Sequence, residues 1–116
     1  MAETDCIFCR IVAGEIPARV AYEDDDVVAF HDLNPQGPVH LLVVPRTHIA
    51  GISAAVAEDA LTLGQCLVAA RRVAEQEGLG EGGYRLVINS GADAGETVPH
   101  LHVHVIGGRR MGWPPG

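Results

Sequence analysis

Only one stretch of this sequence, from about Ala57 to Glu77, has the length and the period of an extended helix. Its apolar residues fall on one stripe, which comprises Ala60, Leu63, Leu67, Ala70 and Ala74. Gly78 follows directly, at the position where a glycine commonly ends a helix. Elsewhere glycine and proline recur at short intervals, which breaks the chain into short elements. The chain is therefore expected to pack one long helix on a sheet.

The remaining segments indicate one short helix and five strands. The strands are expected at 19–22, 27–30, 39–44, 84–89 and 101–106, and the short helix at 6–13, before Gly14 and Pro17. Acidic residues at 23–26 and the turn signal at 34–38 separate the first three strands. We predict an α+β fold over a single domain, residues 1–116, with about five antiparallel strands and the long helix on one face.

Composition excludes several classes of protein. The net charge is −7, with 15 acidic against 8 basic residues, which argues against a nucleic-acid binder. All eight basic residues are arginine, so lysine Schiff-base and P-loop chemistry are excluded. No apolar stretch is long enough to cross a membrane, and the first ten residues lack the apolar core of a secretory signal. With an odd number of cysteines, three, a reduced cytoplasmic protein is expected.

Three alternating histidines carry the strongest chemical signal. On a strand, His100, His102 and His104 would share one face, and Leu101, Val103 and Val105 the other. Three imidazoles on one face can bind a metal or act as nucleophile and acid; the alternative is a set of polar positions on an edge strand. Such a pattern rarely arises by chance from six histidines in 116 residues.

A second candidate site is the pair Cys6 and Cys9. The spacing is that of half a tetrahedral zinc site, which two imidazoles would complete. A redox dithiol and two buried thiols are the alternatives. The third cysteine, Cys66, lies on the expected long helix, where a buried and inert thiol is expected.

The run His-Leu-His-Val-His-Val-Ile at 100–106 resembles the defining motif of the histidine triad (HIT) superfamily. Nearly the whole chain resembles its HINT branch, the histidine triad nucleotide-binding proteins. The matching segments are 5–9, 14–17, 29–32, Asn89 and the ending 107–116. The terminal Trp-Pro-Pro-Gly is specific, because dinucleoside polyphosphate hydrolases and galactose-1-phosphate uridylyltransferases share the triad but not that tail.

The resemblance implies a hydrolase of purine nucleoside 5′-phosphoramidates. In that reading His102 is the nucleophile and forms a nucleotidyl-histidine, while a backbone carbonyl of the same motif holds its other ring N–H. His104 faces the phosphate and helps to protonate the leaving amine, and His40 supports the triad from the neighbouring strand. A nucleotide-binding scaffold and a dinucleoside polyphosphate hydrolase are the alternatives.

The resemblance also implies how the nucleotide is held. Asp32 matches the ligand of the ribose hydroxyls. The other matching positions form an apolar cleft for the base and a loop that meets the phosphate with neutral donors: Ile7, Phe8, Ile11, Phe30, Leu33 and Leu42 with the adjoining His31, and Asn89, Gly95, Thr97 and Val98. Two positions depart from the family's usual pattern, Glu96 for a common glutamine and Thr97 for a common serine.

Metal binding and assembly complete the implied picture. In the metal-binding members of the family, the partners of Cys6 and Cys9 match His48 and His100, which predicts a structural zinc. The family forms twofold dimers in which each C-terminal tail reaches toward the other subunit's nucleotide site. Trp113 in that tail is therefore expected near the nucleotide of a homodimer.

Overall fold

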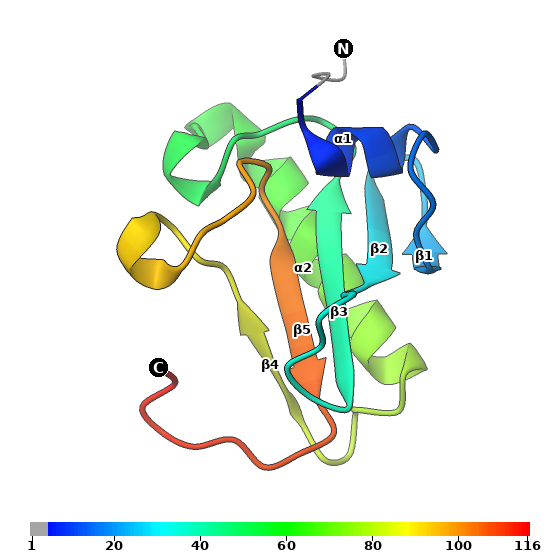
Figure 1. The fold of residues 1–116 in the computed structure, drawn as a ribbon, viewed down its shortest axis with the longest axis vertical. Coiled ribbons are helices and arrows are strands. Elements are labelled where there is room, and N and C mark those ends of the chain that lie inside the picture. The colour runs from blue at the N-terminus through cyan, green and yellow to red at the C-terminus, as the bar shows by residue number, and fades with distance from the viewer. Residues whose placement is uncertain (1–4) are drawn as a thin grey trace.

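The computed structural model describes residues 5–116, so residues 1–4 of the expected domain lie outside the described residues. Five antiparallel strands form one sheet in the order β1-β2-β3-β5-β4 (Figure 1). The strands are β1 (Val20–Glu23), β2 (Val27–His31), β3 (Val39–Pro45), β4 (Tyr84–Val87) and β5 (Val103–Gly107), and the helices are α1 (Ile7–Val12) and α2 (Ala60–Gln76). The predicted α+β class, with one long and one short helix, is confirmed.

Alternation along the central strands divides the core into two layers. Leu41 and Val43 of β3 pack against α2, together with Val103 and Val105 of β5. Leu42 and Val44 point to the opposite face, where they pack with Phe8 of α1 and other residues. Figure 1 shows α2 behind the sheet and α1 across one end of it. The face that α2 leaves open is therefore closed only at that end, by α1.

The buried side of α2 differs from the predicted stripe. The buried residues are Cys66, Ala69, Ala70, Val73 and Ala74, whereas Leu67 is 45% exposed and Ala60 is exposed. Three alanines on the buried side let the helix approach the sheet closely, so this small-residue face packs inward rather than the face with the larger Leu67. Burial of Cys66 is confirmed, at 1% exposed.

The ends of α2 explain why the predicted helix is longer than the observed one. Residues Ala57–Asp59 form a separate 3-10 turn, and Asp59 Oδ2 accepts the Val56 N–H at 3.0 Å. The acidic residues therefore precede the first turn of the α-helix instead of lying in it. Gly78 follows the last turn with a φ of +81°, which confirms the predicted glycine stop.

The last strand is shorter than predicted, because it begins at Val103 rather than 101. The N–H of Leu101 donates to Ile49 O at 2.6 Å, so Leu101 is bonded to the segment after β3 instead of to a neighbouring strand. The triad therefore enters the sheet only at its third histidine. Among residues 5–116, no helix combines the length and the apolar composition that a membrane span requires.

Candidate active site and metal cluster

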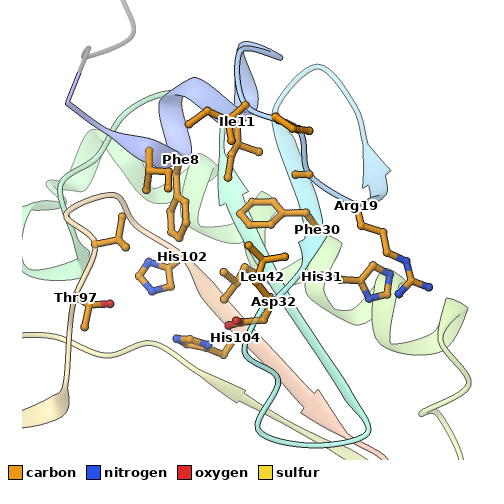
Figure 2. A pocket seen from close by; sticks show the side chains of 16 residues that line it. Phe8, Ile11, Arg19, Phe30, His31, Asp32, Leu42, Thr97, His102 and His104 are labelled. Atoms are coloured by element: carbon orange, nitrogen blue, oxygen red, sulfur yellow. The ribbon is translucent and has the colours of Figure 1, made fainter.

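A pocket of about 260 Å³ opens where α1 meets the ends of the central strands (Figure 2). Phe8 and Ile11 of α1 line it together with Phe30 and Leu42 of the sheet. Asp32, His102 and His104 line the opposite part, as Figure 2 shows. The pocket thus has an apolar region and a polar region with a carboxylate and two imidazoles.

The protonation of His102 follows from one backbone contact. Its Nδ1 lies 2.7 Å from the backbone oxygen of His100, and a carbonyl oxygen only accepts, so Nδ1 carries the proton and donates. In the neutral ring, Nε2 then retains its lone pair. His102 is 7% exposed and its ring packs edge-on against Phe8, with the ring centres 5.2 Å apart. The ring is held with one nitrogen available as a nucleophile.

A chain of hydrogen bonds holds His104 in the opposite tautomer, with its proton on Nε2. The backbone N–H of Gln36 donates to His40 Nδ1 at 3.0 Å, so the neutral His40 ring carries its proton on Nε2. His40 Nε2 lies 2.9 Å from His104 Nδ1, which therefore accepts. The proton of His104 is left on Nε2. Of the histidines that line the pocket, His102 thus has a free lone pair on Nε2 and His104 has an Nε2–H to donate.

Burial favours the neutral forms of His104 and His40. Burial, the largest cause, and the neighbouring rings of His102 and His40 together lower the pKa of His104 from 6.5 to about 4, against the attraction of Asp32. Burial also lowers the pKa of His40, again opposed by the Asp32 carboxylate. A neutral His104 near pH 7 is what the tautomer assignment requires.

Asp32 is held at the end of β2 by its own turn. Its Oδ1 accepts the Asn34 N–H at 2.8 Å, and its Oδ2 lies 3.4 Å from His40 Nε2. The side chain is 20% exposed, so the carboxylate keeps access to the pocket. A carboxylate in this position can accept hydrogen bonds from hydroxyl groups of a ligand.

The loop before His100 carries Glu96, which replaces the family's common glutamine with a carboxylate whose negative charge would repel a phosphate. Its Oε1 accepts the Gly91 N–H at 3.0 Å, and its Oε2 lies 2.7 Å from where a Cβ on Gly51 would stand. Thr97 and Val98 line the pocket, but Glu96 does not. The carboxylate is therefore turned toward its own loop and toward Gly51, and not into the pocket.

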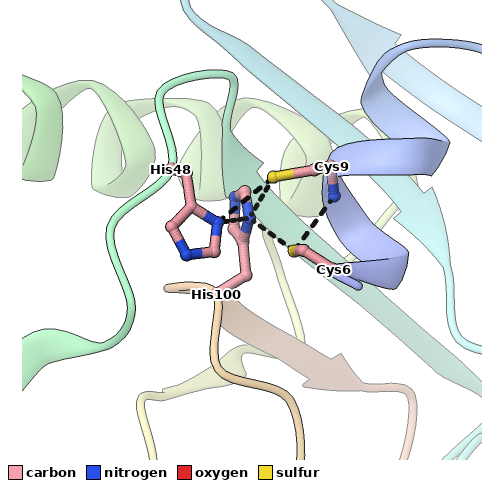
Figure 3. Close-up of side chains that lie close together, drawn as sticks. All are labelled: Cys6, Cys9, His48 and His100. Atoms are coloured by element: carbon pink, nitrogen blue, oxygen red, sulfur yellow. Dashed lines mark hydrogen bonds between the residues drawn. The ribbon is translucent and has the colours of Figure 1, made fainter. Parts of the chain in front are cut away.

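Two cysteines and two histidines form a compact cluster beside the pocket (Figure 3). His48 Nδ1 lies 3.1 Å from both Cys9 Sγ and His100 Nδ1, and His100 Nδ1 lies 3.2 and 3.4 Å from the sulfurs of Cys6 and Cys9. Four ligand atoms around a tetrahedral zinc lie about 3.3–3.8 Å apart, judging from zinc bond lengths. The cluster therefore has nearly the dimensions of a zinc site.

The protonation of His100 agrees with a metal site. Its Nε2 lies 2.9 Å from the carbonyl oxygen of Pro45, so Nε2 carries the proton and Nδ1 faces the cluster with its lone pair. The ring is 0% exposed. Cys6 is the N-cap residue of α1 and Cys9 lies within that helix, so a metal here would tie α1 to the strand ends.

The structure brings most of the predicted nucleotide-binding residues together. Twelve of them line the pocket: Ile7, Phe8, Ile11, Phe30, His31, Asp32, Leu33, Leu42, Thr97, Val98, His102 and His104. Leu33 lies at the rim and is 97% exposed. His40 lies behind His104 and is 5% exposed.

Three predicted residues do not line the pocket. Asn89 and Gly95 belong to the connection between β4 and β5, outside the lining. Trp113 is 84% exposed, in a C-terminal segment that runs beside β4 (Figure 1). In a single chain Trp113 is therefore away from the pocket, and its predicted contact requires a second copy of the chain.

The sequence reasoning missed four residues of the pocket wall: Ile16, Pro17, Ala18 and Arg19. They connect α1 to β1, so the chain has to pass the pocket rim to reach the sheet edge. These residues could be identified only from the packing of α1 near β2, which the sequence does not show.

One family model and several known proteins resemble this chain. The model described as HIT domain matches residues 13–111. A 14 kDa zinc-binding protein of Brassica juncea is 50% identical over 114 residues, 97% of this chain and 100% of that protein. A protein of Arabidopsis thaliana named adenylylsulfatase HINT1 is 48% identical over 117 residues, 99% of this chain and 79% of that protein. The crystal structure of a HIT family hydrolase from Legionella pneumophila has a TM-score of 0.94 and 48% identity, covering 97% of this chain and 100% of that chain.

Proposed function

The chain belongs to the HIT-domain family, and from that premise we propose that it is a hydrolase that cleaves the P–N bond of purine nucleoside 5′-phosphoramidates. The similarity to a HIT family hydrolase supports hydrolysis. The bond cleaved and the nucleoside are inferred from the residues of the pocket. A purine nucleotide is the ligand that we propose.

One observation carries the proposal: His102 and His104, which both line the pocket, are held in opposite tautomers. The carbonyl of His100 leaves His102 with a lone pair on Nε2, and the chain through His40 leaves His104 with a proton on Nε2. A nucleophile and a hydrogen-bond donor at one phosphorus are what in-line displacement of an amine requires.

The reaction proceeds in two steps. His102 Nε2 attacks the phosphorus, and the P–N bond breaks with its electron pair going to nitrogen. The Nε2–H of His104 donates a hydrogen bond to the leaving nitrogen, which takes up one proton from solvent in this step. Water then attacks the nucleotidyl-histidine, the P–N bond to His102 breaks, and the water gives up one proton. Proton uptake and release therefore balance over the turnover.

Each remaining part of the nucleotide is matched to pocket residues of complementary chemistry. Asp32 accepts hydrogen bonds from the ribose hydroxyls, and the base lies among Phe8, Ile11, Phe30 and Leu42. Neutral donors of the 97–98 region meet the phosphate, which suits a protein without lysine.

We also propose that Cys6, Cys9, His48 and His100 hold a zinc ion. The donor set, the separations of its atoms and the zinc-binding relative support this assignment. Such an ion would supply a structural link between α1 and the sheet, with no part in the displacement. Thiolate ligands fit the cytoplasmic location that we propose, because they persist in a reducing compartment.

Hydrolysis of adenylyl sulfate is a second candidate function. The Arabidopsis relative, 48% identical, is named an adenylylsulfatase. The same attack by His102 would break the P–O bond to sulfate. Sulfate is a weak base, so this leaving group departs without a proton, and His104 would matter less.

A rate comparison on the purified protein tests these functions. Adenosine and guanosine phosphoramidates, adenylyl sulfate and a diadenosine polyphosphate are compared at equal concentration. The proposal expects the phosphoramidates to have the highest kcat/KM. Preferred cleavage of the dinucleotide would instead indicate a dinucleoside polyphosphate hydrolase. Nucleotide binding without turnover of any substrate would indicate a scaffold protein.

A further inference from the structure

Arg109, just after β5, binds backbone carbonyls rather than an acidic side chain. Its Nε and Nη2 donate to the carbonyl oxygen of Gln36 at 3.3 and 3.1 Å, and Nη1 donates to that of Arg110 at 3.3 Å. Three of the five N–H donors of the guanidinium are thereby used. The side chain acts as a clamp on the turn that precedes β3.

The chain after β5 is shaped for this contact. Gly108 has a φ of +89°, and a Cβ there would stand 2.9 Å from Pro38 Cβ. Across the same interface, a Cβ on Gly37 would stand 3.2 Å from Ile106 Cγ2 and 3.4 Å from the Gly107 oxygen. The turn 34–38 therefore lies directly on the end of β5, with Arg109 on its outer side.

Gln36, which Arg109 holds, also orients the hydrogen-bonded pair His40 and His104. Gln36 receives Arg109 on its carbonyl and donates its own N–H to His40 Nδ1, and His40 Nε2 contacts His104 Nδ1. We propose that Arg109 is a positioning residue: by holding Gln36, it keeps the proton of His104 on the nitrogen that serves the leaving group. The effect on turnover rests on the proposed function, whereas the effect on the tautomers does not.

The consequence of losing the clamp follows from the two tautomers. When the Gln36 amide withdraws, His40 is free to carry its proton on Nδ1 and to accept from His104 Nδ1–H. The Nε2 of His104 then offers a lone pair instead of an N–H. The leaving amine then loses the hydrogen bond that stabilises it while it takes up its proton. Sulfate leaves without a proton and is little affected.

The decisive variant is Arg109→Ala, with Arg110→Ala as the matched control, because the side chain of exposed Arg110 has no part in the clamp. For an alkylamine phosphoramidate, Arg109→Ala should lower kcat about 10- to 100-fold with little change in KM, which reaches the lower end of the contribution of acid catalysis because the donor is mispositioned rather than removed. For adenylyl sulfate the loss should be smaller than about threefold on the same reasoning. Arg109→Lys should keep part of the parent rate, and Arg110→Ala should keep all of it.

The second measurement needs no substrate. The ring ¹⁵N shifts of His40 and His104, read by NMR on the free protein, should change tautomer in Arg109→Ala and stay as in the parent protein in Arg110→Ala. Unchanged tautomers, or equal losses with both substrates, would overturn the proposal. If the unaltered protein hydrolyses neither substrate, the proposed function fails and the ¹⁵N comparison alone decides the role of Arg109.

A second pair of variants covers the case in which Arg109→Ala does not fold. Gln36→Pro removes the amide N–H while Arg109 stays in place, and Gln36→Ala keeps that N–H. The proline variant should show the tautomer change and the selective loss with the phosphoramidate. An alanine variant with the same loss as the proline variant would contradict the proposal, because it would assign the effect to the Gln36 side chain.

Discussion

The backbone oxygen of His100 accepts the Nδ1–H of His102 at 2.7 Å, and the ring of the same His100 belongs to the Cys/His cluster. Phe8 packs edge-on against both rings, with centres 6.0 and 5.2 Å away. The cluster and the proposed nucleophile are therefore parts of one packed unit that α1 completes.

Replacing the proposed nucleophile tests the covalent mechanism. His102→Ala should lower turnover of an adenosine phosphoramidate at least about a thousandfold, because the attacking nitrogen is lost. Nucleotide affinity, measured by calorimetry, should stay largely intact because the pocket remains. His102→Asn is the gentler control, since it preserves volume and some hydrogen bonding. A variant with most of the original rate would exclude the nucleotidyl-histidine.

Metal content tests whether the Cys/His cluster binds zinc. Protein purified without chelator should carry about one zinc per chain, and Cys6→Ser or Cys9→Ser should lose the metal and lower the Tm. Turnover should fall less, because the metal anchors α1 without entering the displacement. The matched control is Cys66→Ala: this thiol is 1% exposed, outside the cluster, and burial raises its pKa to about 11. Zinc-free protein with both thiols of the pair freely titratable would contradict the assignment.

The pH dependence tests the neutral state of His104. Its pKa in the folded protein is about 4, below the ordinary 6.5, so the unfolded chain takes up a proton first as the pH falls. The stability linked to His104 is therefore complete above pH 6.5 and is lost between pH 6.5 and 4.

The corresponding measurement is the Tm of the parent protein and of His104→Gln as functions of pH. The parent should lose stability more steeply between pH 6.5 and 4, where the groups facing His104, namely His102, His40 and Asp32, are the same in both proteins. Parallel Tm curves would show that burial does not lower the pKa of His104.

Glu96 gives a test of where its charge lies. Because Oε1 accepts the Gly91 N–H, Glu96→Gln keeps the acceptor and should change nucleotide affinity less than about threefold, the scale expected of a surface charge. Glu96→Ala removes the acceptor and should weaken the 91–96 loop, seen as faster amide exchange there. A tenfold gain in affinity with glutamine would place the carboxylate beside the phosphate instead.

Assembly is the fifth prediction. Leu86 of the edge strand β4 and Ile88, just after that strand, are each 36% exposed, and Leu61 and Val68 of α2 are 73% and 49% exposed. An isologous interface would bury such surface, so light scattering should show a homodimer. Deleting Trp113–Gly116 should alter selectivity among leaving amines more than the turnover of small phosphoramidates. A monomer at micromolar concentration, or a deletion without effect on any substrate, would contradict this arrangement.

Local patterns in the sequence were enough to predict most of the fold. The helical period that contains α2, the alternation of Val103 to Val105 in β5 and the turn at 34–38 depend on spacing along the chain. Alternation, for example, put Val103 and Val105 on the face opposite His104, and both pack under α2 as it implies, whereas His100 and His102 precede the strand. The pair of cysteines was equally visible, and the family resemblance supplied His48 and His100 as partners.

Only the tertiary structure decided which atoms meet. That Leu67 faces solvent, that Trp113 lies away from its own pocket, and that Ile16 to Arg19 form a wall depend on how distant segments pack. The protonation of each imidazole is a further case, because it is set by a backbone donor or acceptor from elsewhere: Gln36 for His40, Pro45 for His100 and the His100 carbonyl for His102. Sequence spacing indicates on which face of a helix or strand a side chain lies. The direction of a hydrogen bond depends on backbone groups that only folding brings together.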